Sequence, residues 1–213
     1  MSLQVIEIYP SIQGESTYTG VPCSFVRLAG CPLRCKWCDT AYGFESGQQM
    51  SFDDIITEVV SHNLPTVELT GGEPLAQNNS IPLMKSLVKT GIKVLIETSG
   101  SISIKEIPDE VHIVMDLKCP DSRMSHHNDL NNLKYIKSSD DIKFVIASRN
   151  DFDWAVQMTQ GHRLEEKCHV LFSPAWGLIK PEDLVSWILE APVNPRLNLQ
   201  THKYIWSPRK KGV

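Results

Sequence analysis

The sequence predicts an α/β fold: a partial, open, TIM-like β/α barrel with roughly six mostly parallel strands and reduced helices. Short β-branched runs alternate with amphipathic helical patterns, which is typical of parallel strands joined by crossover helices. At 213 residues the chain is shorter than the about 250 residues of a complete eight-stranded barrel. We expect residues 1–213 to form one domain.

The first half of the chain begins with two predicted strands, 3–9 and 24–28. Ser51-Phe52-Asp53-Asp54 is similar to a capping box and predicts a helix that continues to about residue 60. A strand at 66–70 breaks at Gly71-Gly72-Glu73-Pro74. A helix then begins near Pro82 and ends at Gly91, because proline suits a helix start and glycine a helix end.

The second half continues the alternation. Strands are predicted at 93–97, 111–116, 142–147, 169–172 and 197–200, and helices at about 151–160 and 181–191, with a weak helix at 129–136. The stretch between Gly100 and Val111 is too short for a regular helix with its loops. Unusual polar residues stand at or just after the strand ends, the edge where parallel α/β folds place their active sites.

The net charge, the lengths of the apolar runs and the cysteine content argue against several classes of function. The net charge of −4 argues against a nucleic-acid partner, and no apolar run approaches the length of a membrane span. Six cysteines, three of them in one short loop, suit a reducing compartment better than a disulfide framework. We therefore expect a cytoplasmic protein without membrane partners.

Three thiols within eight residues form the most informative motif. Cys31, Cys35 and Cys38 have the spacing C-x3-C-x2-C, and thiolates are soft ligands that select iron–sulfur clusters or zinc. A [4Fe–4S] cluster held by three cysteines leaves one iron free to bind a substrate or cosubstrate. A closed zinc site needs a fourth ligand, for which Cys23 is the nearest candidate.

Other motifs have both an ordinary and a functional interpretation. The glycines of Gly71-Gly72-Glu73-Pro74 form a common turn, or they let the backbone approach a ligand closely. Arg27 is suited to bind a carboxylate with two hydrogen bonds, or it forms a structural ion pair. Thr40 caps a turn, or it offers one oxygen to a Mg²⁺ ion that keeps several waters.

Together, the cysteine loop and the GGEP element resemble the radical S-adenosylmethionine superfamily. The resemblance implies that Cys31, Cys35 and Cys38 hold a [4Fe–4S] cluster whose open iron binds S-adenosylmethionine. It also implies a set of contacts to this cosubstrate. That set is Trp37, Cys38, Asp39, Gly72, Glu73, Ser99, Asp116, Leu117, Lys118, Ser173, Pro174, Ala175 and Trp176.

Further pieces extend the resemblance over nearly the whole chain, from about residue 11 to 208. They include Ser11-Ile12-Gln13-Gly14-Glu15, Phe25-Val26-Arg27-Leu28 and Gln200-Thr201-His202-Lys203-Tyr204. Together they are similar to the 7-carboxy-7-deazaguanine synthase family, lyases of queuosine and 7-deazapurine biosynthesis. The resemblance implies Thr40 as a Mg²⁺ ligand. It also implies a set of substrate contacts, which is Ile12, Gln13, Gly14, Glu15, Arg27, Thr70, His202 and Pro208.

The implied reaction converts 6-carboxy-5,6,7,8-tetrahydropterin to 7-carboxy-7-deazaguanine, with ring contraction and loss of ammonia. The cosubstrate is cleaved reductively and re-formed in each cycle, so the resemblance implies an electron donor such as flavodoxin or ferredoxin. It also implies a homodimer. The protein would contribute positioning and would exclude water and oxygen.

The chain departs from the family pattern at its end. Some members end at a proline whose terminal carboxylate touches the substrate, whereas here Arg209-Lys210-Lys211-Gly212-Val213 follow Pro208. Two alternative functions stay open at this point. A glycyl-radical activating enzyme shares the cysteine loop but acts on a protein, and a non-enzymatic zinc-binding module would not need the GGEP element.

Overall fold

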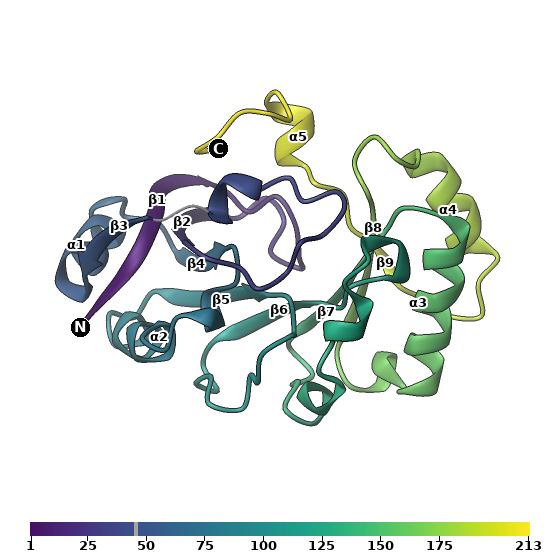
Figure 1. Ribbon diagram of the computed structural model, residues 1–213, viewed down its shortest axis with the longest axis horizontal. Coiled ribbons are helices and arrows are strands. Elements are labelled where there is room, and N and C mark those ends of the chain that lie inside the picture. Colours follow the sequence, from purple (N-terminus) through teal and green to yellow (C-terminus); the bar gives the residue numbers. More distant parts are fainter. Residues whose placement is uncertain (45–46) are drawn as a thin grey trace.

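The computed structural model describes residues 1–44 and 47–213, and its centre is a nine-stranded sheet (Figure 1). The strand order is β3-β1-β2-β4-β5-β6-β7-β8-β9. The strands are β1 (Ser2–Ile12), β2 (Pro22–Leu28), β3 (Gln48–Ser51), β4 (Thr66–Gly71), β5 (Lys93–Thr98), β6 (His112–Asp116), β7 (Asp141–Ile146), β8 (His169–Pro174) and β9 (Arg196–Leu197). From β2 to β9 all neighbours pair in parallel, whereas β1 pairs antiparallel with both β2 and β3.

Helices cover the outer face of this curved sheet, with α1 and α2 near one end and α3 and α4 near the other (Figure 1). The α-helices are α1 (Phe52–Ser61), α2 (Ser80–Val88), α3 (Arg149–Gly161), α4 (Pro181–Leu189) and α5 (His202–Ile205). The 3-10 helices are Ala41–Phe44, Pro74–Ala76, Pro120–Ser122, Ser125–His127, Leu130–Lys134 and Leu164–Glu166. No helix of the described residues is long and apolar enough to cross a bilayer.

The expected open barrel of parallel strands is confirmed, and local chemistry explains its helix ends. Ser51 caps α1 by accepting a hydrogen bond from the Asp54 backbone N–H at 3.2 Å, as the capping pattern predicted. Pro181 stands in the first turn of α4, where its missing N–H leaves no helical hydrogen bond unmade. Gly91 follows α2 with a φ of +84°, which glycine adopts without strain.

Several elements differ from their predictions. The weak helix at 129–136 is a 3-10 turn at Leu130–Lys134, and the strand expected at 197–200 is reduced to Arg196–Leu197. Strand β3 and the short helix α5 were not predicted, because neither has enough residues to display a period. The first two strands are antiparallel since a hairpin loop, not a crossover helix, joins them.

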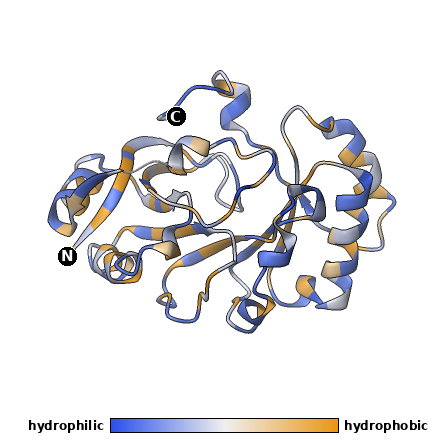
Figure 2. Cartoon of the chain, viewed as in Figure 1, coloured by the Kyte–Doolittle hydropathy of each residue, from blue (hydrophilic) through white to orange (hydrophobic). Residues whose placement is uncertain are grey.

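The central strands turn one apolar face toward the helices, and their other face carries polar as well as apolar residues. Val67 and Leu69 of β4 lie in the core between sheet and helices, whereas Glu68 and Thr70 line a cavity on the inside of the curved sheet. Strand β7 repeats this pattern, with Ile142 and Phe144 in the core. Figure 2 shows the apolar residues along the central strands. The sheet therefore stabilises the protein with one face and builds a site with the other.

Candidate active site

A cavity of about 790 Å³ lies inside the curved sheet and reaches the C-terminal ends of its parallel strands. Strands β2, β4, β5, β6 and β7 contribute lining residues, together with the residues just after β8, the cysteine loop and the segment that follows β9. Active sites of parallel α/β folds lie at this edge, because the loops there leave the strands in the same direction. This cavity is the candidate active site.

The cysteine loop follows β2 and forms one wall of the cavity. Cys31, Cys35 and Cys38 all line it, and all are free thiols. Arg34 shapes the loop from outside, since its Nη1 donates to the carbonyl oxygens of Cys31 and Leu33, each at 2.7 Å. Burial raises the pKa of each cysteine thiol, and the Lys118 ammonium opposes this shift.

The donor chemistry of this loop fits an iron–sulfur cluster. No three His, Cys, Asp or Glu side chains of residues 1–44 and 47–213 converge closely enough to enclose a single metal ion. A cubane cluster is larger than one ion and takes each thiolate on a different iron, so its ligands stand farther apart. Cys23 does not lie among them. It is completely buried at the start of β2, the strand end away from the loop, where burial raises the pKa of its thiol to about 12.

The loop after β4 packs directly against the cysteine loop. A Cβ atom on Gly72 would lie 2.1 Å from the carbonyl oxygen of Gly30, so only glycine fits there. The Glu73 N–H donates to the same Gly30 oxygen at 2.8 Å. The glycine pair therefore brings the backbone of the loop after β4 into contact with the cysteine loop.

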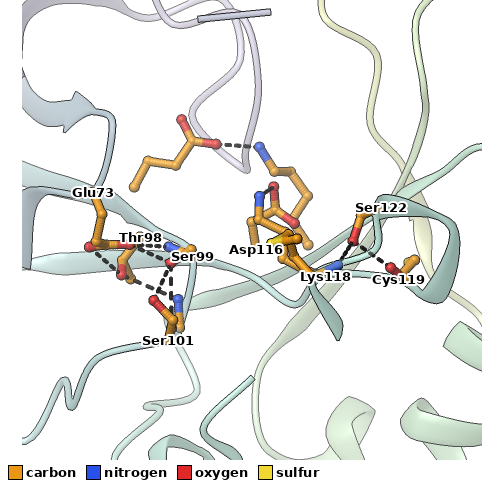
Figure 3. Close-up of polar contacts among 12 residues, drawn as sticks. Glu73, Thr98, Ser99, Ser101, Asp116, Lys118, Cys119 and Ser122 are labelled. Atoms are coloured by element: carbon orange, nitrogen blue, oxygen red, sulfur yellow. Dashed lines mark hydrogen bonds and ion pairs between the residues drawn. The ribbon is translucent and has the colours of Figure 1, made fainter. Parts of the chain in front are cut away.

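Glu73 does not line the cavity. Its carboxylate holds this loop in place through hydrogen bonds to Thr98 and Ser99 (Figure 3). Its completely buried carboxylate accepts hydrogen bonds from the Leu75 N–H at 3.0 Å and the Thr98 hydroxyl at 2.9 Å. Ser99 donates two more, from its N–H at 2.7 Å and its hydroxyl at 2.6 Å. The side chain thus joins the loop to the end of β5 and leaves cavity contacts to Gly72 and Ser99.

A second polar group stands where β6 ends (Figure 3). Lys118 Nζ donates to Asp116 Oδ2 at 2.7 Å, while Asp116 Oδ1 is buried with no hydrogen-bond partner among the described residues. An unpaired buried carboxylate oxygen is costly, so it indicates a ligand that supplies a donor. Both side chains line the cavity beside Cys35 and fit a polar cosubstrate there.

Arg27 is held in place from one side and reaches the cavity with the other. Its Nε donates to Glu7 at 2.8 Å and its Nη2 to the Tyr9 hydroxyl at 2.9 Å. The guanidinium also lies 5.7 Å from the centre of the Tyr42 ring. The two interpretations of Arg27 are therefore compatible, because Nη1 makes no hydrogen bond within the described part of the chain and the residue lines the cavity.

Thr40 lies beside an ion pair that joins the cysteine loop to the chain end. Its hydroxyl donates to Asp39 at 3.0 Å, and Lys203 Nζ contacts the other Asp39 oxygen at 2.5 Å. The Lys203 ammonium holds the pKa of Asp39 well below its usual range, against the effect of burial. Thr40 and Asp39 thus offer adjacent hard oxygen atoms at the cavity mouth, the ligand type that Mg²⁺ prefers.

Two motifs from opposite ends of the chain meet in the cavity. Gln200 donates to Glu15 at 2.9 Å, and the Thr201 N–H donates to the Gly14 oxygen at 2.9 Å. A Cβ atom on Gly14 would lie 2.1 Å from His202 Nδ1, so the glycine makes room for that ring. Burial lowers the pKa of His202, which favours its neutral form.

The floor of the cavity contains charged residues that the sequence analysis did not select. Lys143 of β7 is nearly enclosed, donates to Glu15 at 2.7 Å and contacts Glu97. Glu68 of β4 accepts a hydrogen bond from the Gln13 side chain. A signal did exist, because Glu68 and Lys143 each interrupt an apolar strand, in Val67-Glu68-Leu69 and Ile142-Lys143-Phe144, and Glu97 directly follows the apolar run Val94-Leu95-Ile96.

Comparison with known proteins shows to which family the chain belongs. Residues 26–147 match the Radical SAM superfamily. The 7-carboxy-7-deazaguanine synthase of Koribacter versatilis is 46% identical over 99% of this chain and 100% of its own. The enzyme of the same name from Chlorobaculum tepidum is 40% identical, over 99% and 97%. The chain belongs to the 7-carboxy-7-deazaguanine synthase family. The resemblance inferred from the cysteine, GGEP and QTHK motifs is confirmed.

A solved member of the 7-carboxy-7-deazaguanine synthase family has the same fold. The crystal structure of QueE from Escherichia coli superposes with a TM-score of 0.80 and 23% identity, over 95% of each chain. Membership in this family also decides against the glycyl-radical activating enzyme and the zinc-binding module. The superfamily implies a [4Fe–4S] cluster and S-adenosylmethionine, and the cysteine loop, Gly72 and Asp116 fit them.

Most contact residues expected from the 7-carboxy-7-deazaguanine synthase resemblance line the one cavity. They are Ile12, Gln13, Gly14, Glu15, Arg27, Cys31, Cys35, Trp37, Cys38, Asp39, Thr40, Thr70, Gly72, Ser99, Asp116, Lys118, Ala175, Trp176, His202 and Pro208. Glu73, Leu117, Ser173 and Pro174 do not line it and are buried behind its wall. Ser173, for example, accepts a hydrogen bond from Asn198 at 2.8 Å, which joins β8 to the segment after β9.

The segment after Pro208, where the chain departs from some family members, also lines the cavity. Arg209, Lys210, Lys211, Gly212 and Val213 all contribute to its mouth. Lys211 Nζ lies 4.1 Å from the centre of the Tyr42 ring, the same ring that flanks Arg27. The lining of the site therefore continues beyond Pro208. The five residues after it lie on the side of the cavity where Arg27 lies.

Proposed function

We propose that this protein is a radical S-adenosylmethionine lyase that converts 6-carboxy-5,6,7,8-tetrahydropterin to 7-carboxy-7-deazaguanine in 7-deazapurine biosynthesis. The observation that supports this most strongly is 46% identity, over the full length of both chains, to a protein named for that product. The cavity adds a physical argument, because the cysteine loop and the QGE and QTHK motifs line the same space.

Cys31, Cys35 and Cys38 would hold the [4Fe–4S] cluster, with Gly72, Ser99, Asp116 and Lys118 around S-adenosylmethionine. Cluster and cosubstrate together would supply a carbon radical that abstracts hydrogen from C6 of the pterin. The chain's own residues position the reactants: the Gly72 backbone and the unpaired Asp116 oxygen offer contacts to the cosubstrate. With its mouth covered, the cavity would keep water and oxygen from the reacting carbon.

The pterin would lie between the cysteine loop and the QGE motif. Arg27 is oriented by Glu7 and Tyr9, and its Nη1, which has no hydrogen-bond partner among the described residues, is available for the substrate's carboxylate. Ile12, Gln13, Gly14, Glu15, Thr70 and His202 would contact the ring. Pro208 and the residues after it would cover the mouth once the substrate is bound.

A Mg²⁺ ion would bind at the same mouth, with Thr40 as a protein ligand and the substrate carboxylate as another. Adjacent oxygens on Thr40 and Asp39 support this assignment. Few protein ligands suffice, since Mg²⁺ keeps several waters.

The electron would come from a small acidic protein such as flavodoxin or ferredoxin. Arg34, Lys36 and Arg123 are exposed on the outer side of the cysteine loop, and they support an acidic partner. The Lys36 N–H donates to the Ser122 oxygen at 3.2 Å, which brings the two segments together. We further propose a homodimer in the cytoplasm, where a reducing environment keeps the thiols available for the cluster.

Product analysis tests the reaction directly. The protein is reconstituted with iron and sulfide without oxygen, then incubated with reductant, S-adenosylmethionine and the carboxytetrahydropterin. We expect 7-carboxy-7-deazaguanine and ammonia in equal amounts, with the cosubstrate undepleted. Cys35→Ala is the matched control and should form neither product. Methionine formation without a deazaguanine product would contradict the proposed substrate.

A further inference from the structure

Glu68 differs from the other acids on the cavity floor because no cation among residues 1–44 and 47–213 forms a hydrogen bond with it. Glu15 and Glu97 both contact the Lys143 ammonium, and Glu15 also accepts from Gln200. Within the part of the chain that the structure describes, Glu68 Oε2 accepts a hydrogen bond from the neutral amide of Gln13 and from no other group. Its Oε1 accepts no hydrogen bond from the described residues and is not among their enclosed, unpaired polar atoms, so it faces open space in the cavity.

The surroundings of Glu68 suit a flat, polar ring. Phe25 of β2 stands opposite Glu68 in the strand register, and Tyr9 stacks on Phe25 with ring centres 5.2 Å apart. Both aromatic residues line the cavity. Such a wall accepts the face of a heterocycle, while the adjacent carboxyl group meets its edge.

The depth of Glu68 matches one end of the proposed substrate. Arg27 stands opposite Thr70 in the register, and Phe25 opposite Glu68, so Glu68 lies two residues deeper than Arg27. Two residues of a strand span about 6.6 Å. A pterin whose carboxylate reaches Arg27 therefore extends its 2-amino-4-oxopyrimidine ring toward Glu68.

We propose that Glu68 is a specificity-determining residue that binds the 2-amino-4-oxopyrimidine edge of the substrate through its two carboxylate oxygens. That edge presents two parallel donors, the 2-amino group and the ring N3–H, which match a carboxylate as a guanidinium does. Gln13 keeps the carboxyl group oriented. The inference rests on the proposed function, which supplies the pterin.

Charge balance on the floor supports this assignment. Glu15, Glu97, Lys143, Tyr9 and Cys23 are the titratable groups around Glu68. Burial, followed by the Glu97 carboxylate, raises the pKa of Glu68 well above its usual range, which favours the protonated acid in the empty site. Two substrate donors favour the carboxylate, and binding therefore releases the Glu68 proton to solvent.

The test compares two ligands on the reconstituted holoenzyme without reductant, by anaerobic calorimetry. One ligand is the carboxytetrahydropterin, and the other is its analogue with a 2-oxo group in place of the 2-amino group. We expect the natural protein to prefer the 2-amino ligand by at least about 100-fold. Glu68→Gln should reduce this ratio at least about tenfold and bind the 2-oxo analogue more tightly, because its amide donates to the new carbonyl.

Two controls separate recognition from folding. Glu68→Asp keeps the carboxyl group and should still prefer the 2-amino ligand. Iron content and melting temperature equal to those of the natural protein would show that Glu68→Gln and Glu68→Asp both fold. Calorimetry in two buffers of different ionisation enthalpy should show about one proton released by the natural protein and none by Glu68→Gln. Equal ligand ratios, or equal proton release, in natural protein and Glu68→Gln would overturn the inference.

These outcomes stay separate from those of the proposed function. If the natural protein forms 7-carboxy-7-deazaguanine and the ligand ratio does not respond to Glu68→Gln, the inference fails and the reaction stands. If the protein binds the pterin with the predicted ratio but forms no deazaguanine, the reaction fails and the role of Glu68 in recognition stands.

Discussion

Individual side chains at the cavity rim divide into those that face the ligands and those that hold other residues in place. Cys31, Cys35 and Cys38 line the cavity as free thiols, and Arg27 keeps one nitrogen free while Glu7 and Tyr9 hold the others. Glu73 belongs to the second kind, because its carboxylate accepts hydrogen bonds from Leu75, Thr98 and Ser99.

Removal of a cluster ligand should be distinguishable from removal of a structural cysteine. Cys31→Ala, Cys35→Ala or Cys38→Ala should each abolish cosubstrate cleavage, because a cubane held by two thiolates is not retained. Cys23→Ala and Cys168→Ala change only buried thiols outside the cavity lining and should keep iron near the natural content. The measurement is iron per chain after anaerobic reconstitution. Equal iron loss in Cys23→Ala would mean that the ligand assignment is wrong.

We expect the Thr40 hydroxyl to be required for the stimulation of turnover by Mg²⁺. We expect activity to rise with added Mg²⁺, and we expect Thr40→Val to lose this stimulation because valine keeps the branched shape without the oxygen. Thr40→Ser retains the hydroxyl and should retain most of the response. Turnover is measured against Mg²⁺ concentration for the three proteins. A valine variant that responds like the natural protein would limit Thr40 to its hydrogen bond with Asp39.

Between elements, the contacts of the loops with one another determine the shape of the site. The loop after β1 reaches across to β7, where the Thr17 N–H donates to the enclosed Asp141 at 2.9 Å. His112 of β6 contacts the same carboxylate at 3.2 Å. This anchor lies at the starts of β6 and β7 and keeps Glu15 within reach of Lys143.

Glu73→Gln should show how much the hydrogen bonds between the GGEP loop and β5 contribute to stability. Glutamine has an NH₂ group in place of one carboxylate oxygen. Depending on its orientation, this NH₂ group would face either the two Ser99 donors or the Thr98 and Leu75 donors, and those donors would lose their acceptor. We expect the free energy of unfolding to fall by about 2 kcal/mol, since buried donors lose their acceptor. Denaturant unfolding of the cluster-free protein provides the measurement. Affinity for S-adenosylmethionine should fall as well, because Gly72 and Ser99 are no longer fixed relative to each other.

At the scale of the whole molecule, the chain end lies over the mouth of the barrel (Figure 1). Residues 209–213 line the cavity, and Lys203 ties the preceding helix α5 to Asp39. Deletion of residues 209–213 should raise the KM for the pterin about tenfold and leave the melting temperature unchanged, because these residues add little to the core. Kinetics and thermal unfolding of the shortened protein are compared with the natural one. A KM equal to that of the natural protein would exclude a role for this segment in substrate binding.

The outer side of the cysteine loop should determine how well a protein donor reduces the enzyme. Lys36→Glu combined with Arg123→Glu reverses two exposed charges there and should slow turnover with flavodoxin at least about tenfold at low salt. Turnover with dithionite should not change, since that reductant needs no docking. Lys85→Glu, on the exposed side of α2, is the matched control. Equal slowing with both reductants would point to damage of the cluster loop.

The sequence by itself determined the parallel open barrel and the family, and it selected the three thiols that line the cavity, because each depends on local patterns. Strand and helix periods, the C-x3-C-x2-C spacing and the GGEP turn are all short stretches of contiguous residues. Only the tertiary structure decided what the interior polar residues do. Glu68, Glu97 and Lys143 lie on three different strands, and Gln13 and Gln200 come from opposite ends of the chain. Their hydrogen bonds and charges depend on distances through space, which chain folding sets and no linear spacing encodes.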